Sequence, residues 1–200
     1  MSSSHINDAS GWPQSPLVQI DFGQLTTSPE VLSVAEVPFL SHINVRGAAD
    51  NRQFLKAVKG VLELELPLVA NRFVSSDSVT VLWYGPSEWL VLAPPDAATE
   101  LVPRLQQSLG DTLAQVTDVS GGSTVLDIRG NRARELLNKA CTIDLHPSVF
   151  ATGHCVQTSF AHATAAIYQY EDAPAYRLII RRSFADYLGT WMLHAANEFN

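Results

Sequence analysis

Apolar and polar positions follow an order that occurs twice along this chain. In the second half, a strand pattern at 123–128 leads to Gly130, a helical pattern, a loop, paired strands and a last helix. Residues 42–109 follow the same order. Placing Val45 on Ile128, an offset of 83 residues, aligns the two copies. The sequence therefore predicts an α+β fold built from an internally duplicated strand-helix-strand-strand-helix unit.

The alignment brings apolar positions of the first copy onto apolar positions of the second. The aligned pairs are Ile43 and Leu126, Phe54 and Leu137, Val58 and Cys141, and Leu62 and Leu145. Each copy also carries an aromatic-rich hairpin, at 83–89 and at 168–176. The strands predicted from alternation are 43–46, 79–84, 89–92, 113–119, 123–128, 155–161, 165–170 and 176–181. Residues 61–69 form either a further strand or an extended segment over the core.

Helix boundaries follow from capping residues. We expect Asp50 to begin the first helix and Gly60 to end it, because glycine readily adopts a left-handed conformation. Ser183 is the expected cap of the last helix, which is the clearest amphipathic helix of the chain. Its apolar positions are Phe184, Tyr187, Leu188, Trp191, Ala195 and Phe199.

The N-terminal region has a different character. Pro29 and Pro38 exclude a long helix, and the alternation of Val18, Ile20 and Phe22 suits one short strand. We therefore expect residues 1–40 to form an extended arm, which wraps its own domain or lies across another subunit. Residues 41–200 are then a single α+β domain of two pseudo-repeats, 41–110 and 113–200.

Composition limits the partners of this domain. A net charge of −7 argues against nucleic acid, whose phosphates require a basic surface. No apolar run approaches the roughly 20 residues of a membrane span, and no signal-peptide pattern opens the chain. Two cysteines in 200 residues give no disulfide framework, so we expect a cytoplasmic location. A charged fraction of 16% fits a well-packed monomer and a partner-covered surface equally well.

Motifs of known chemistry are scarce. The sequence holds neither the glycine-rich dinucleotide fingerprint nor a P-loop. The spacing of His146, His154 and Cys155 matches no zinc pattern, and Cys141 falls on an apolar helix face, as expected of a buried thiol. We therefore predict no catalytic, cofactor-binding or metal-binding residue in this chain.

Two groups of residues remain as candidate anion or interface contacts. Arg181, Arg182 and Ser183 lie where a strand passes into a helix, so they bind a carboxylate or phosphate, or form a solvated strand end or an intersubunit ion pair. Trp83 and Trp89, with Tyr84 between them, either stack on a planar pterin or flavin ring or belong to the core.

Four stretches resemble the gamma subunit of heterotetrameric sarcosine oxidase. They are 136–147 (LLNKACTIDLHP), 150–158 (FATGHCVQT), 181–188 (RRSFADYL) and 84–92 (YGPSEWLVL). The resemblance covers about 43 to 199 and is specific, because the motifs occur in the family's order. It implies a fold like the folate-binding domain of the glycine-cleavage aminomethyltransferase.

The resemblance also implies an enzyme complex. Together with alpha, beta and delta subunits, the chain would belong to an assembly that oxidises sarcosine with oxygen to glycine and hydrogen peroxide and passes the one-carbon unit to tetrahydrofolate. FAD, FMN, NAD and zinc are implied to be held by the other subunits. The family assigns no catalytic residue to gamma, so we expect a structural or assembly role. The alternative is a free-standing folate-binding or aminomethyltransferase-like protein.

Overall fold

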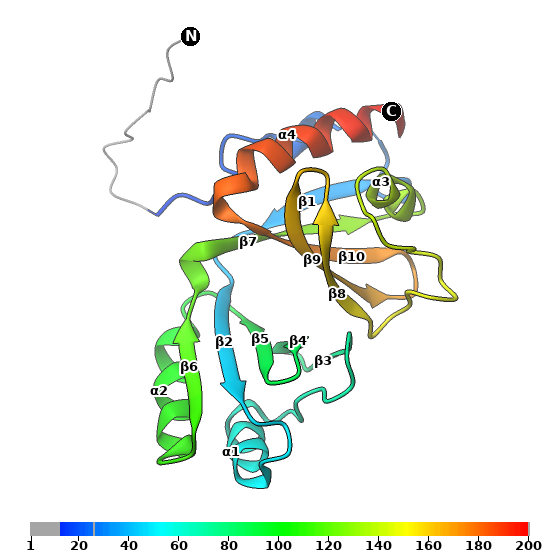
Figure 1. Ribbon diagram of the computed structural model, residues 1–200. Coiled ribbons are helices and arrows are strands. Elements are labelled where there is room, and N and C mark those ends of the chain that lie inside the picture. The colour runs from blue at the N-terminus through cyan, green and yellow to red at the C-terminus, as the bar shows by residue number, and fades with distance from the viewer. Residues whose placement is uncertain (1–12, 26, 200) are drawn as a thin grey trace.

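The computed structural model describes residues 13–25 and 27–199 and contains two five-stranded antiparallel sheets (Figure 1). One sheet has the strand order β3-β4-β5-β2-β6. Its strands are β2 (Ser41–Gly47), β3 (Phe73–Ser75), β4 (Thr80–Gly85), β5 (Glu88–Ala93) and β6 (Ala114–Asp118). Helices α1 (Arg52–Leu62) and α2 (Ala98–Leu109) cover its outer face.

The other sheet has the order β1-β7-β10-β9-β8. Its strands are β1 (Ser33–Val37), β7 (Ser123–Arg129), β8 (Cys155–Phe160), β9 (Ala163–Glu171) and β10 (Ala175–Arg181). Helices α3 (Ala133–Asn138) and α4 (Ala185–Ala196) cover its outer face. Short 3-10 turns complete the fold: η1 (Phe22–Gln24), η2 (Ser120–Gly122), η3 (Arg182–Phe184) and η4 (Asn197–Phe199).

The duplicated α+β organisation is confirmed. In each half a pair of strands is followed by a helix, three strands and a second helix, and both sheets have the same order of equivalent strands. The first strand of each half leaves its own sheet: β1 pairs with β7, and β6 pairs with β2. The two halves thus exchange their edge strands, which joins them into one body.

Strand alternation divides the core into three layers. On β2, Ile43 and Val45 face α1 and α2, whereas on β10, Leu178 and Ile180 face α3 and α4. Between the two inner faces lies a third cluster. Its buried members are Leu82, Leu90, Leu92, Val125, Cys155, Ala166, Tyr168 and Ile179. Each sheet is therefore covered on both faces, as the long apolar strands require.

The eight strands predicted between residues 43 and 181 are present within a few residues of their predicted bounds. The pattern missed β1 and β3, which are short edge strands. Residues 61–69 are not a strand: α1 continues to Leu62 and a loop follows, in which Leu66 is buried. Of the two predicted alternatives, a strand or an extended segment over the core, the structure adopts the extended segment.

The N-terminal region packs against its own chain. β1 lies antiparallel to β7, and Leu17 and Leu32 are buried in the cluster beneath α4. The expectation of a strand at Val18, Ile20 and Phe22 is wrong, because turns bonded from i to i+3 bring Leu17 against Gly189 of α4. Residues 1–12 of the predicted arm lie outside the described residues.

Two helix boundaries differ from the predictions. Asn51, not Asp50, caps α1, since its side chain accepts hydrogen bonds from the backbone N–H groups of Gln53 and Phe54. Gly60 lies inside the helix, and Glu63 takes the left-handed conformation that ends it, with φ of 57°. The buried Leu62 explains the longer helix, because one more turn places it in the core.

Gly130 should be intolerant of a side chain. Its φ is 107°, and a Cβ atom there would lie 2.5 Å from the backbone oxygen of Val31. At this point the segment before β1 packs closely against the turn after β7. We expect Gly130→Ala to lower the free energy of unfolding by about 2–4 kcal/mol through clash and backbone strain. Urea denaturation measures this change.

Gly60→Ala is the matched control. Its Cβ would meet nothing within 4 Å, and alanine is the better residue inside a helix. The free energy of unfolding should therefore rise by about 0.5–1 kcal/mol. Equal effects of the two substitutions would contradict the backbone packing described at Gly130.

Candidate functional site: the cleft between the two sheets

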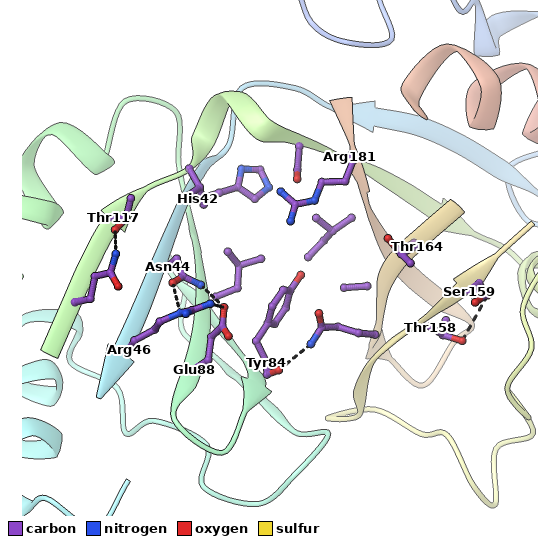
Figure 2. Close-up of a pocket in the computed structure, with 18 residues that line it drawn as sticks. His42, Asn44, Arg46, Tyr84, Glu88, Thr117, Thr158, Ser159, Thr164 and Arg181 are labelled. Carbon is purple, nitrogen blue, oxygen red and sulfur yellow. Dashed lines mark hydrogen bonds and ion pairs between the residues drawn. The ribbon is translucent and has the colours of Figure 1, made fainter. Parts of the chain in front are cut away.

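The two inner faces do not touch along their whole length. Next to the apolar inter-sheet cluster they diverge around a cleft of about 790 Å³ (Figure 2). Strands β2, β4, β5 and β6 form one wall, and β8, β9 and β10 form the other. Polar side chains predominate along the cleft, and they include His42, Asn44, Thr117, Gln157, Thr164 and Arg181.

His42 occupies the inner end of the first wall. It is 2% exposed and lies where the chain crosses between the sheets: its backbone N–H donates to Ser120 Oγ (3.0 Å), and its carbonyl accepts from Val119 (2.8 Å). Its Nδ1 atom lies 2.9 Å from the carbonyl oxygen of Leu40. Burial lowers the pKa of the imidazole, so His42 is neutral.

The tautomer of His42 follows from this contact. A carbonyl oxygen only accepts hydrogen bonds, so Nδ1 carries the proton and donates it to Leu40. Nε2 is then a hydrogen-bond acceptor, and it is buried. Among the described residues, this buried nitrogen has no hydrogen-bond partner. The wall of the cleft therefore contains a buried acceptor that no described protein group satisfies.

Arg181 projects from the end of β10 on the opposite wall. In the described part of the chain its guanidinium forms no hydrogen bond and no ion pair. The other arginine of the cleft, Arg46, is neutralised by Glu88 at 2.9 Å, and Asn44 donates to the same carboxylate oxygen at 2.7 Å. Arg181 thus carries the one uncompensated charge among the described residues that line the cleft.

Tyr84 stands between the two walls. Figure 2 shows its ring rising from β4, with the hydroxyl group directed toward the end of the cleft where the His42 imidazole and the Arg181 guanidinium point toward each other. Burial is the main cause that raises the pKa of this phenol, and the nearby positive charge of Arg181 opposes it in part. Tyr84 therefore stays protonated and can donate a hydrogen bond.

The structure separates the candidate residues that the sequence grouped together. Arg181 lines the cleft, whereas Arg182 and Ser183 lie in η3 and are not part of the lining. The expectation that Ser183 caps α4 is wrong, because the 3-10 turn intervenes and no side chain caps that helix.

The two tryptophans face away from the cleft. Trp89 is fully buried against Phe54, at 5.6 Å between ring centroids, and its Nε1–H donates to the carbonyl of Pro67. Trp83 is half-buried and does not line the cleft. Successive side chains of a strand point to opposite faces of the sheet. Tyr84 and Glu88, which are the neighbours of the two tryptophans along the hairpin, therefore lie on the inner face.

A second polar cluster lies farther along the inner face, near the opposite end of β7. Asp127 accepts hydrogen bonds from Tyr170 and Arg129, both at 2.5 Å, and lies 3.6 Å from Arg177. Both guanidinium groups also approach the ring of Tyr170. Glu171 lies 3.9 Å from Arg129, so two carboxylates balance the two guanidinium groups and this cluster offers no free charge to a ligand.

The thiols are held in an unreactive form. Cys155 Sγ donates to the carbonyl oxygen of Arg72 at 3.1 Å, and burial raises its pKa to about 12. Burial likewise raises the pKa of half-buried Cys141 to about 11. Within residues 13–25 and 27–199, no group of three or more His, Cys, Asp and Glu side chains is placed to hold a metal ion.

Sequence reasoning missed His42. The signal was present in β2, where His42, Asn44 and Arg46 alternate with Ser41, Ile43 and Val45. A strand with one apolar and one polar face in an otherwise buried sheet indicates a polar space inside the protein.

Comparison with known proteins decides the family. Residues 46–198 match the model of the "Sarcosine oxidase, gamma subunit family". The chain belongs to this family. The resemblance of the four sequence motifs is thereby confirmed.

Relatives of this gamma family cover most of the chain. It is 31% identical to the sarcosine oxidase subunit gamma of Corynebacterium sp. (strain U-96), over 84% of this chain and 81% of that protein. It is 27% identical to the corresponding subunit of Arthrobacter sp., over 100% of this chain and 97% of that protein. The similarity therefore includes both halves of the fold.

Solved structures agree with this assignment. A chain of the heterotetrameric sarcosine oxidase from Corynebacterium sp. U-96 superposes with a TM-score of 0.85 and 26% identity, over 94% of this chain and 96% of that chain. Aminomethyltransferase T of Bartonella henselae superposes with a TM-score of 0.62 at 11% identity, over 82% of this chain and 45% of that chain. The second similarity shows the fold alone and confirms the predicted fold class. No helix in the described residues of this gamma family member has the length and apolar character to span a membrane.

The raised thiol pKa values predict slow alkylation. At pH 8 a thiol with a pKa of about 11 holds about a hundredfold less thiolate than one with the ordinary value of 9, so iodoacetamide should modify Cys141 about a hundredfold more slowly in the folded chain than in urea. Cys155, which is buried, should react more slowly still. Mass spectrometry of time points measures both rates, and a fast-reacting cysteine in the folded chain would contradict the described environment.

Proposed function

We propose that this chain is a non-catalytic structural subunit of a sarcosine oxidase complex. Its partners would be the alpha, beta and delta subunits of an assembly that oxidises sarcosine to glycine, releases hydrogen peroxide and transfers the one-carbon unit to tetrahydrofolate. The similarity to a chain of the solved heterotetramer over almost the whole length of both chains carries this proposal.

The extent of that similarity supports a whole-subunit role. It includes both sheets and the helices that cover them, since it spans 94% of this chain. A partner that recognises this fold would therefore find the same surfaces on both proteins. The relatives named as gamma subunits also extend across both halves, which supports the same placement in a complex.

The state of the ionisable groups supports a role without chemistry of its own. Both thiols are kept protonated, His42 is a buried neutral imidazole, and the acidic side chains Glu88 and Asp127 form ion pairs with arginine. A nucleophile or general base needs a pKa near the working pH and access to substrate. We propose accordingly that FAD, FMN, NAD and zinc, as well as the folate-dependent step, belong to other subunits.

Exposed apolar side chains supply contact area for partners. Leu113 is 93% exposed and Val69 is 66% exposed, and further large apolar residues reach the surface on several elements. These residues are Val18, Phe39, Leu68, Val149, Phe184 and Tyr187. In a subunit interface such side chains become buried and stabilise the complex through the hydrophobic effect.

Co-expression tests the proposal. A tagged copy of this chain, produced together with alpha, beta and delta chains from the same genome, should purify in a stable complex that oxidises sarcosine, whereas the lone chain should show no turnover. Omitting the chain should lower the yield or the melting temperature of the remaining complex, because the surfaces it covers are then exposed.

The matched controls are the same tagged chain with Gly60→Ala and with Gly130→Ala. The first should assemble normally, and the second should assemble less, because it populates the folded state less. Elution of the unchanged chain alone under all conditions, or sarcosine turnover by the lone chain, would refute the proposal.

The free-standing folate-binding protein has less support. The relatives are named as oxidase subunits, and the similarity to aminomethyltransferase T extends only to the fold. Calorimetric titration of the lone chain with a reduced folate distinguishes the two proposals, since submillimolar binding would favour the free-standing protein.

A further inference from the structure

One buried titratable side chain lies where the chain passes from the first sheet to the second. His42 stands at the start of β2, and its backbone is bound by the crossover between β6 and β7. Ser120 Oγ accepts from the His42 N–H at 3.0 Å, and the Val119 N–H donates to the His42 carbonyl at 2.8 Å. The position of His42 therefore bears on how the two sheets are held together.

The imidazole of His42 is closed off from water. The side chain is buried, and Nε2 has no hydrogen-bond partner among the described residues. Nδ1 already donates its proton to the carbonyl of Leu40. A second proton, on Nε2, would create a cation with an N–H group that neither water nor a described protein group satisfies in this arrangement. Such a buried charge is strongly unfavourable.

Two charged groups act on this ring from the neighbouring strands. Asp118, at the end of β6, favours the charged imidazole, whereas Arg181, at the end of β10, points toward the ring and disfavours it (Figure 2). The hydroxyl of Tyr84 on β4 is protonated, the residue opposite on β5 is a leucine, and η2 consists of serine and glycine. Burial outweighs the attraction of Asp118 and lowers the pKa of His42 below its ordinary value of 6.5.

Hydration of a charged imidazole requires the ring to move. The inter-sheet cleft, of about 790 Å³, adjoins the wall in which His42 lies. Turning the ring toward that space breaks its hydrogen bond to Leu40 and strains the two backbone bonds to the crossover. Val119 is the single residue between β6 and η2, and β7 follows η2 directly. A displacement at His42 is therefore passed to the ends of strands in both sheets.

We propose that the contact between His42 and the crossover is an acid-sensitive joint between the two sheets. At neutral pH the uncharged ring packs in the wall and the joint is closed. When His42 takes up a proton, the ring leaves its buried position, the crossover loosens and the cleft widens. This device is independent of the structural role proposed above, because it resides within one chain.

The direction of the pH dependence follows from the lowered pKa of His42. The unfolded or opened chain binds the proton with the ordinary pKa of 6.5, and the closed chain binds it only at lower pH. The contribution of the neutral ring to stability is therefore complete above this value and decreases as the pH falls below it. The decrease ends below the pKa of the closed state. Between pH 7.5 and 5.5, one such proton lowers the folding equilibrium constant by about three- to tenfold.

Two variants test the joint by urea denaturation at pH 7.5 and 5.5. His42→Asn keeps a donor for the Leu40 carbonyl but gains no proton. The folding equilibrium constant of the unchanged chain should therefore fall about three- to tenfold more than that of this variant. His194→Asn removes an exposed histidine of α4 and is the matched control. Its loss should equal that of the unchanged chain within about twofold.

Amide hydrogen exchange in the unchanged chain locates the opening. The Val119 N–H donates to His42, whereas the Gly47 N–H donates to the carbonyl of Ser87 at the far end of β2. Lowering the pH from 7.5 to 5.5 should reduce the protection factor of Val119 at least about threefold more than that of Gly47.

An NMR titration of the ring tests the role of the neighbouring carboxylate. The pKa of His42 should lie below 6.5 in the folded chain. Asp118→Asn keeps an acceptor for the Ser120 N–H but removes the negative charge that favours the imidazolium, so it should lower this pKa further.

Two results would overturn the proposal. One is an equal loss of stability between pH 7.5 and 5.5 in the unchanged chain and in His42→Asn. The other, which decides the matter if that variant does not fold, is a parallel change in the protection of Val119 and Gly47. Where the chain purifies only with its partners, exchange is measured on the complex. Neither result bears on co-purification, so failure of this joint and failure of the structural role are distinguishable.

Discussion

The exchange of edge strands between the two halves is the constraint on which the rest of this structure depends. β1 completes the sheet of the second half by pairing with β7, and β6 completes the sheet of the first half by pairing with β2. Separating the two halves of the chain would break both ladders and expose the inner apolar cluster to water, which is unfavourable on both counts. On the far side, Cys155 N–H donates to the carbonyl of Asn71, and Gln157 donates to that of Tyr84, so the sheets are linked at a second edge as well.

This exchange also creates the cleft. The crossover from β6 to β7 passes beside the start of β2, and its hydrogen bonds to His42 hold the two inner faces at a fixed relation. Apolar side chains such as Leu82 and Ile179 close the space in one region, while His42, Arg181 and Tyr84 occupy the region that remains open. The buried imidazole of His42 is tolerated there because its Nδ1 donates a hydrogen bond to the carbonyl oxygen of Leu40.

The ionisable groups of the site are held in unreactive states. Burial keeps both thiols and the cleft phenol protonated and keeps His42 neutral, and the carboxylates of Glu88 and Asp127 are neutralised by arginines. These states support the structural role proposed above for this member of the sarcosine oxidase gamma family.

The sequence by itself determined the duplicated α+β class, the family and each strand long enough to show alternation, because these depend on local periodicity and on motifs. It also singled out Arg181 at the end of a strand. Only the tertiary structure decided that β1 and β6 change sheets, that Trp89 faces α1 while Tyr84 faces the cleft, and that His42 and Arg181 line the same cleft. Local patterns reveal that a strand has two faces, but which distant segment covers each face is fixed by packing between residues far apart in the chain.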